Sequence, residues 1–262
     1  MPATDQTSRR EGSLPARPTR RRRLTNPART APRLAQLFSP GVAAAELRAD
    51  GDAALLHPDE STGTIGFAPK RVAEFAAGRL CARRALADLG IFDFPIAIGP
   101  DRSPRWPPGI CGSISHTQGY CCAVAAPRHV VTGIGIDVEI IGRVDSELDA
   151  LIFTRAEAEF LASLERHART CAATVIFSAK EAFYKCQYPI TQRWLDFTAV
   201  TIELVPARVS GSTQRSAAGD DGGSFLIGAA AGRPQLDDRF EQKPRGRFRV
   251  EAGVVATGIT VG

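Results

Sequence analysis

The sequence predicts an α+β fold of two similar lobes, each a small antiparallel sheet packed on one long helix. Two segments, 69–89 and 172–187, place apolar residues at the 3.6-residue spacing of an amphipathic helix, with cationic side chains at the edge of the apolar stripe. Each is followed by short segments of alternating apolar residues separated by turn residues. We therefore expect one lobe over 34–132, a second over 133–262 and a cleft between them.

The composition indicates a globular protein. The chain has 262 residues, of which 44% are hydrophobic and 23% are charged, which is enough to build cores of real size. No apolar run approaches the roughly 20 residues that span a bilayer, and the N-terminus lacks the apolar stretch of a signal peptide. The six cysteines are scattered, without C-x-x-C or Cys/His ligand spacing, so we interpret them as reduced thiols of a cytoplasmic protein.

Positive charge gathers near the N-terminus, where residues 9–33 hold nine arginines and one acid. Such a run is compatible with a nucleic-acid-binding arm or a transit peptide. It has no interleaved aromatic residues and no periodic apolar face, and we therefore favour a disordered tail over residues 1–33. Residues 207–224, rich in Ser, Gly, Ala and Asp, are expected to form a flexible insertion in the second lobe.

Several short strands are predicted in the first lobe. Strand-like segments occur within 38–56, before the first long helix. A loop rich in Pro and Gly, 99–109, leads into two strands over 110–115 and 120–126. A third strand over 133–140 follows a short turn, so the order predicts a three-stranded antiparallel meander.

Three arginines mark the first long helix. Arg79 and Arg83 lie one turn apart at the edge of its apolar face, and Arg71 lies two turns before Arg79. Arginines in such positions either cover the core with their aliphatic stems or bind phosphates through forked hydrogen bonds. The spacing is compatible with both roles.

The strand over 133–140 carries an acidic pair. Its isoleucine and valine residues point to one face, and the other face holds two glycines followed by Asp137 and Glu139. Two carboxylates one pleat repeat apart, about 6–7 Å, repel each other unless a cation lies between them. The glycines leave the same face clear for a ligand. A solvated strand edge shows the same pattern, so these residues alone leave a metal site and a wet edge both open.

The second long helix can complete such a site. Glu181 and Lys185 share one face at i, i+4, as do Lys180 and Tyr184. A third carboxylate and two amines suit a magnesium ion that holds a pyrophosphate. A Glu–Lys pair at this spacing is also common as a plain surface ion pair.

The remaining elements of the second lobe follow from local signals. Thr154 and Glu157 form a capping box that starts a helix. The helix over 172–187 is expected to end before Pro189, because the residue before a proline disfavours helical geometry. Further strands are expected over 198–204, 248–250 and 254–261.

Five motifs occur in a fixed order over residues 55–205. They are Glu74-Phe75 with Gly78-Arg79 and Ala82-Arg83-x-Ala85-Leu86, then Trp106-Pro107 with Gly112-Ser-Ile-Ser-His116, Gly135-Ile-Asp-Val-Glu139, Phe177-Ser-Ala-Lys-Glu-Ala-x-Tyr-Lys185, and Trp194-Leu-x-Phe197. Together they resemble the 4'-phosphopantetheinyl transferases of the surfactin/enterobactin-synthetase type. The Gly-Ile-Asp-x-Glu motif alone is weak, but combined with the lysine-rich motif it is specific.

The resemblance implies a reaction. Such an enzyme transfers 4'-phosphopantetheine from coenzyme A to a serine of an acyl or peptidyl carrier protein, with Mg²⁺ on the pyrophosphate, and releases adenosine 3',5'-bisphosphate. The family serves pathways such as siderophore or polyketide biosynthesis. The fold that it implies is a pseudo-two-fold monomer with the active site at the junction of the lobes.

The resemblance also assigns residues to roles. It makes Asp137, Glu139 and Glu181 the magnesium-site acids, with Glu181 as candidate base for the serine proton. It places cationic and polar residues on the phosphates and adenine of coenzyme A: Lys185, Lys180, Ser115, His116, Arg79, Arg71 and Arg83. Relatives often carry a lysine where this chain has Ile98, so the nucleotide contact is expected to fall to Arg102 or Arg105.

Two other functions have partial support in the sequence. A serine hydrolase built on Ser115 and His116 is disfavoured, because neighbouring residues of a strand point to opposite faces and no Gly-x-Ser-x-Gly motif is present. A non-catalytic protein that binds coenzyme A or another nucleotide, or nucleic acid through the arginine-rich tail, stays open.

Overall fold

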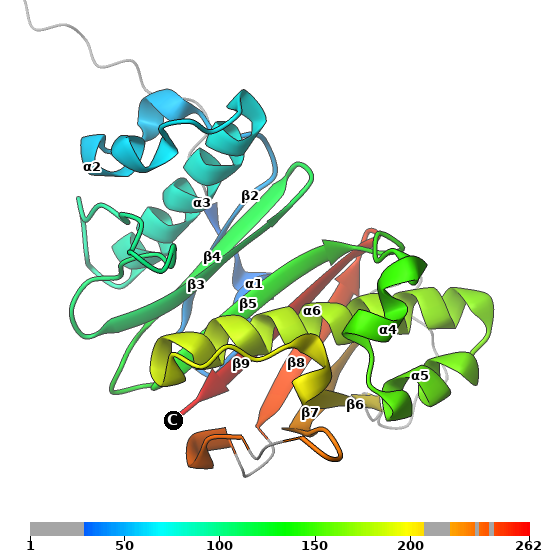
Figure 1. The fold of residues 1–262 in the computed structure, drawn as a ribbon. Coiled ribbons are helices and arrows are strands. Elements are labelled where there is room, and N and C mark those ends of the chain that lie inside the picture. Colours follow the sequence, from blue (N-terminus) through cyan, green and yellow to red (C-terminus); the bar gives the residue numbers. More distant parts are fainter. Residues whose placement is uncertain (1–28, 207–220, 234–235, 241–243) are drawn as a thin grey trace, which may run out of the picture.

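The computed structural model describes residues 29–206, 221–233, 236–240 and 244–262. Two antiparallel sheets form its centre, and each is covered by one long helix (Figure 1). No helix in the described ranges is both long enough and apolar enough to cross a membrane. The predicted α+β fold of two lobes is confirmed.

Four strands form the sheet of the first lobe, in the order β1-β2-β4-β3. Their bounds are β1 Arg29–Thr30, β2 Ala43–Leu47, β3 Ile110–Thr117 and β4 Tyr120–Pro127. The helices of this lobe are α1 Pro32–Ala35, α2 Pro58–Ser61 and α3 Pro69–Asp88, with short 3₁₀ helices η1 Ala53–Leu55 and η2 Thr62–Thr64. The helix predicted over 69–89 is thus confirmed, and Gly90 follows it with a positive φ of 80°.

Five strands form the sheet of the second lobe, in the order β5-β9-β8-β7-β6. Their bounds are β5 Gly133–Ile140, β6 Val200–Pro206, β7 Asp221–Ala229, β8 Arg245–Glu251 and β9 Val254–Val261. The helices are α4 Asp149–Ile152, α5 Arg155–Ala162 and α6 Arg166–Thr191, with 3₁₀ helices η3 Ser146–Leu148, η4 Phe197–Ala199 and η5 Asp238–Phe240.

The same three-stranded unit occurs in both sheets. In the first lobe the order β2-β4-β3 contains a hairpin whose strands are joined by two residues, Gln118 and Gly119. In the second lobe the order β5-β9-β8 contains a hairpin joined by Ala252 and Gly253. A long helix, α3 or α6, packs on the strand that precedes it in the chain. The lobes are therefore structural repeats.

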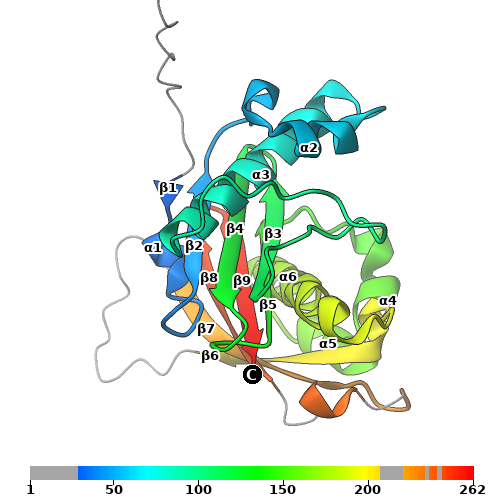
Figure 2. The same ribbon diagram turned by 90° about the vertical axis from the view of Figure 1, so that its left-hand side faces the viewer.

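The strands of both lobes lie between α3 and α6 (Figure 2). One apolar cluster fills the space under each helix, and a third lies where the two sheets meet. Ile134, Ile136 and Val138, the predicted core face of β5, belong to this third cluster. The opposite face of β5 is turned toward α6 and carries the two acids.

The predicted meander is wrong at its third strand. The strand β4 already has a partner on each side, β2 and β3, so β5 cannot pair with it. It pairs instead with β9. The strands β3 and β5 lie side by side, but serine hydroxyls take the place of backbone-to-backbone hydrogen bonds between them. The Ser113 Oγ accepts a hydrogen bond from the Ile136 N–H at 3.2 Å, and the Ser115 Oγ accepts one from the Val138 N–H at 3.3 Å.

Some predicted boundaries also differ. The helix α6 starts earlier than expected and runs through Pro189, which in the last turn removes only one backbone hydrogen bond. The capping box of Thr154 and Glu157 is confirmed. Of the predicted tail, 1–28 lies outside the described residues, but the rest contains β1, which pairs with β2. Residues 207–220 of the predicted insertion also lie outside the described residues, and its last residues begin β7.

Candidate active site

A cleft of about 980 Å³ lies at the junction of the two lobes. Its walls come from α3, β3 and the loop 101–109 of the first lobe, and from β5, α6 and Trp194 of the second. Eight of the ten residues that the sequence placed in the site line this cleft: Arg71, Arg79, Ser115, His116, Asp137, Glu139, Glu181 and Lys185.

Asp137 is the centre of the acidic wall and is 2% exposed. Its Oδ1 accepts hydrogen bonds from the Ser115 hydroxyl at 2.8 Å and from the Lys185 ammonium at 2.6 Å. Lys185 also donates to the Ser115 Oγ at 3.2 Å. The second carboxylate oxygen, Oδ2, is buried and has no hydrogen-bond partner among the described residues. A buried carboxylate oxygen without a donor is costly unless a ligand satisfies it.

Gly135 explains how α6 comes so close to this carboxylate. A Cβ at Gly135 would lie 1.9 Å from the carbonyl oxygen of Ala182, so only glycine lets the helix lie directly on β5. The sequence-based expectation that the glycines clear the strand for a ligand is therefore wrong at this position, because α6 fills the space. The close packing brings Glu181, which precedes Ala182, and Lys185, which follows it by three residues, to the cleft beside Asp137.

Two of the three acids, Glu139 and Glu181, have raised pKa values. Burial and the charge of Asp137 raise the pKa of Glu139 to about 7, although Lys185 opposes the shift. Burial also raises the pKa of Glu181; Lys185 counteracts this and Asp137 adds to it. Burial works to lower the pKa of Lys185, but Asp137 and Glu181 outweigh it and the pKa is raised. The second lobe therefore presents excess negative charge that one lysine only partly neutralises.

The donor set fits a hard divalent cation such as Mg²⁺. Such a cation binds carboxylate oxygens, and the unpartnered Oδ2 of Asp137 is one. In the part of the chain that the structure describes, no three acidic, His or Cys side chains stand close enough together to form a complete metal site. The cation that contacts the other oxygen of Asp137, Oδ1, is the Lys185 ammonium.

The opposite wall, from the first lobe, is basic. The Arg71 guanidinium lies 2.5 Å from the His116 Nε2 and 3.3 Å from the Glu74 carboxylate. Burial, and then the charge of Arg71, lower the pKa of His116, which favours the neutral imidazole whose Nε2 accepts a hydrogen bond from the Arg71 guanidinium. Arg79 is 7% exposed, donates through Nε to the Ile96 carbonyl at 2.8 Å, and remains a cation although burial lowers its pKa to about 10.

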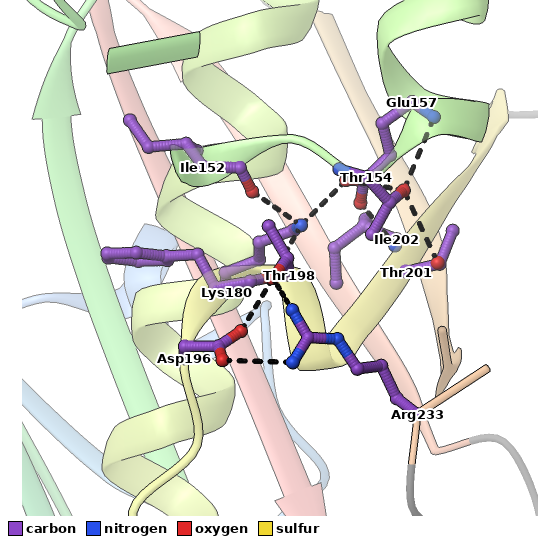
Figure 3. A network of polar contacts seen from close by, with 10 residues as sticks. Ile152, Thr154, Glu157, Lys180, Asp196, Thr198, Thr201, Ile202 and Arg233 are labelled. Atoms are coloured by element: carbon purple, nitrogen blue, oxygen red, sulfur yellow. Dashed lines mark hydrogen bonds and ion pairs between the residues drawn. The ribbon is translucent and has the colours of Figure 1, made fainter. Parts of the chain in front are cut away.

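Lys180 and Arg83 are not brought to the cleft. The Lys180 ammonium donates to the carbonyl oxygens of Ile152 and Phe197 and to Glu157 (Figure 3). Arg83 binds Glu60 in the same way. For Lys180 the reason is helical geometry, because it precedes Glu181 by one residue and its side chain projects roughly 100° away from that of Glu181 around α6. The structure thus gives no support to their predicted contacts with phosphates.

Comparison with known proteins matches both lobes. A family model described as the 4'-phosphopantetheinyl transferase N-terminal domain matches residues 66–126, and one described as the 4'-phosphopantetheinyl transferase superfamily matches residues 133–225. Their border falls between β4 and β5, where the structure passes from one sheet to the other.

Curated relatives agree. The chain is 32% identical over 213 residues to the 4'-phosphopantetheinyl transferase Svp of Streptomyces mobaraensis, covering 81% of each chain. It is 34% identical over 227 residues to the 4'-phosphopantetheinyl transferase PptT of Mycobacterium tuberculosis, covering 84% of this chain and 92% of that protein. The chain belongs to the 4'-phosphopantetheinyl transferase family.

A solved structure, the Thermotoga maritima holo-[acyl-carrier-protein] synthase, is similar over 50% of this chain and 63% of that one, with 18% identity and a TM-score of 0.36. That likeness is too low to add to the identification. Members of the family transfer phosphopantetheine from coenzyme A to carrier proteins, and this chain is a transferase.

Sequence reasoning missed part of the transferase cleft. Tyr184 stacks on Tyr188 at 5.4 Å and makes an edge contact with Trp194 at 5.3 Å between ring centroids. Trp194 is 79% exposed, and all three rings line the cleft. The tyrosines stand at i, i+4, a signal that could have placed them on one helix face.

The loop before β3 distinguishes Arg102 from Arg105, the two residues expected to make the nucleotide contact in place of a lysine at position 98. The Ile98 side chain packs toward Gly63 and carries no charge into the cleft. Arg102 lines the cleft, whereas Arg105 does not. Arg102 has a positive φ of 68°, and its N–H donates to the Gly99 carbonyl at 2.9 Å, so a tight turn presents its side chain.

Proposed function

We propose that this transferase moves 4'-phosphopantetheine from coenzyme A to a serine hydroxyl of an acyl or peptidyl carrier protein and requires Mg²⁺. The serine oxygen forms a bond to the β-phosphorus, the bond from that phosphorus to the bridging oxygen breaks, and adenosine 3',5'-bisphosphate leaves. One observation carries the proposal: the buried carboxylate of Asp137, which has one unsatisfied oxygen, lines the same cleft as Glu139 and Glu181 and faces a basic wall.

The acidic wall supplies the metal site and the base. Asp137, Glu139 and Glu181 would hold Mg²⁺, which neutralises charge on the pyrophosphate when bound. Glu181 is the candidate general base, because its raised pKa brings a carboxylate closer to neutral, where proton transfer is most effective. The serine proton would move to a Glu181 carboxylate oxygen, directly or through one water.

The polar residues around the acids have separable tasks. Lys185 lies between Asp137 and the open cleft and would donate to the pyrophosphate. The hydroxyl of Ser115 donates to Asp137, so its first task is to orient that carboxylate. Arg71, Arg79 and His116 would bind the remaining phosphate of the nucleotide.

The cellular setting is also a proposal. Both walls of the cleft come from one chain, which supports action as a monomer. The six cysteines are free, which supports a reducing compartment such as the cytoplasm. A carrier protein is the expected partner. No observation in the described residues favours nucleic acid, and the arginine-rich segment lies almost wholly outside them.

The test measures the mass gain of an apo carrier protein incubated with coenzyme A, Mg²⁺ and this protein. Asp137→Ala and Glu181→Ala should each lower the rate at least about a hundredfold, a loss of the size seen when transition-state charge loses its partner. Glu203→Ala, which removes an exposed acid from the same sheet, is the matched control and should keep the wild-type rate. Full activity of both acid variants, or an equal rate in excess EDTA, contradicts the proposal.

A further inference from the structure

Lys180 sits in a fully enclosed polar junction behind the cleft. Its side chain is 1% exposed, and its ammonium donates to the Ile152 carbonyl at 2.8 Å, the Phe197 carbonyl at 2.8 Å and the Glu157 Oε2 at 2.6 Å. All three ammonium hydrogens are thereby used. No donor is left for a substrate phosphate, and none of the three partners lines the cleft.

Glu157 extends the junction to two further segments. Its Oε2 also accepts from the N–H of Thr154 at 2.7 Å, as the capping box requires, and its Oε1 accepts from the Ile202 N–H at 2.7 Å. The Lys180 junction is the name we give to these groups: the side chains of Lys180 and Glu157, the N–H groups of Thr154 and Ile202, and the carbonyls of Ile152 and Phe197. Figure 3 shows how it ties α6 to the end of α4, the start of α5, and β6.

We infer that Lys180 is a positioning residue that fixes α6 so that Glu181 stands beside Asp137. This rests on the proposed function of the cleft. Lys180 and Glu181 are consecutive on one helix, so any slide or rotation that separates Lys180 from Glu157 carries Glu181 away from Asp137. A displacement of about 1 Å at a reacting group can lower a rate by about a hundredfold.

The junction also reaches the aromatic side of the cleft. Phe197, whose carbonyl Lys180 binds, follows Trp194 by three residues. The Phe197 ring contacts the ring of Phe177 at 5.5 Å, and Phe177 lines the cleft. In contrast, Arg71, Arg79 and His116 belong to α3 and β3, and the hydrogen bonds of their side chains stay within the first lobe. Loss of the junction should therefore disturb turnover and spare nucleotide binding.

Two variants test this. Lys180→Met with Glu157→Gln removes both charges together, which avoids leaving one charge buried without a partner. We expect kcat for carrier modification to fall about 10- to 100-fold, while the Kd for adenosine 3',5'-bisphosphate, measured by calorimetry, changes by less than about twofold. Lys180→Arg keeps the cation, and Arg83 shows that an arginine can bind a buried glutamate and a carbonyl in this fold. It should recover most of kcat.

Hydrogen exchange of the α6 amides over 177–187 gives a readout that needs no activity. We expect faster exchange in the double variant than in the wild type, and near-wild-type exchange in Lys180→Arg. A double variant with wild-type kcat and exchange overturns the inference, as does a tenfold loss of nucleotide affinity in either variant. If the double variant does not fold, Glu157→Gln alone, which leaves Lys180 with its two carbonyl partners, is measured in its place and is judged by the same criteria. A wild-type protein that modifies no carrier refutes the proposed function, and the exchange comparison then still decides the role of Lys180.

Discussion

The two lobes hold the same buried ion-pair junction, built at the same spacing. In the first lobe Arg83 binds Glu60, and in the second Lys180 binds Glu157. In each, the cation lies 23 residues after the glutamate and 28 residues after a carbonyl that it also binds. In each, the glutamate closes a capping box three residues after the N-cap. The repetition indicates that these junctions belong to the scaffold and not to the chemistry.

The strands that face the two long helices differ. Asp137 pairs with Thr257, the fourth residue of β9, and Ala45 pairs with Ala123, the fourth residue of β4. The two positions are therefore equivalent, and the first lobe has a buried methyl group where the second has the central carboxylate.

The helices differ in the same way. The residue after Arg83 in α3 is Arg84, which pairs with Asp88 at 3.0 Å on the surface. The equivalent residues of α6 are Glu181 and Lys185. Their charges are opposite to those of Arg84 and Asp88, and both side chains line the cleft. A few differences at matched positions thus distinguish the first lobe, which supplies the basic wall, from the second, which supplies the acidic wall.

The largest expected difference between the lobes concerns stability. Lys180→Met leaves Glu157 charged in a fully enclosed place, and the free energy of unfolding should fall by about 3–5 kcal/mol. Arg83→Met should cost less, about 1–3 kcal/mol, because the Arg83 side chain is 22% exposed and water can reach Glu60 once it is removed. Urea unfolding followed by circular dichroism measures both.

The double variant Lys180→Met with Glu157→Gln is the control for this comparison, since removing both charges should recover most of the lost stability. An Arg83→Met variant that is as unstable as Lys180→Met, or more so, would show that the two junctions do not differ in burial as the structure indicates.

Local patterns predicted what depends on neighbours along the chain. The 3.6-residue period located α3, the Thr154–Glu157 capping box located the start of α5, and strict alternation put Asp137 on the face opposite the core. These features depend on residues within a few positions of one another, so they can be read without the fold.

Contacts between distant segments could not be predicted in this way. The pairing of β5 with β9 joins Gly133 to Val261. Lys180 and Lys185 share a helix, and the groups that hold Lys180 away from the cleft, among them buried Glu157 23 residues before it, are distant in the sequence. The resemblance to a family supplied a list of residues, but it did not separate those that meet the substrate from those that hold the helix.

A smaller difference concerns how close each helix lies to its sheet. Gly135 in β5 is equivalent to Ala43 in β2, because both lie two residues before the matched positions Asp137 and Ala45. A methyl group at Gly135 would meet the Ala182 carbonyl at 1.9 Å, so Gly135→Ala should force α6 outward. We expect a loss of about 1–3 kcal/mol in stability from this overpacking, together with a fall in kcat.

Thermal unfolding and the carrier-modification assay measure this effect. Gly228→Ala, at a glycine of β7 with no atom within 4 Å of its added Cβ, is the matched control and should be close to wild type. Equal stability of the two variants would contradict the close approach of α6 to β5.

The smallest expected effect concerns nucleotide affinity, which should depend on the first-lobe junction between Arg83 and Glu60. The Glu60 Oε1 accepts from the Ile96 N–H at 2.9 Å, and the Ile96 carbonyl accepts from the Arg79 Nε at 2.8 Å. The junction of the first lobe therefore holds a cation of the basic wall, as that of the second lobe holds an acid. Arg83→Met with Glu60→Gln should raise the Kd for adenosine 3',5'-bisphosphate about three- to tenfold, which corresponds to about one hydrogen bond.

At saturating coenzyme A the same variant should keep kcat within about twofold, because the proposed role of Arg79 is to bind the nucleotide and not to act on the reacting phosphorus. Arg84→Ala with Asp88→Ala, which removes the exposed pair of α3, serves as control and should change neither quantity. A fall in kcat with unchanged nucleotide affinity would mean that the first-lobe junction, like the second, acts on the acidic wall, and the division of labour between the lobes would have to be abandoned.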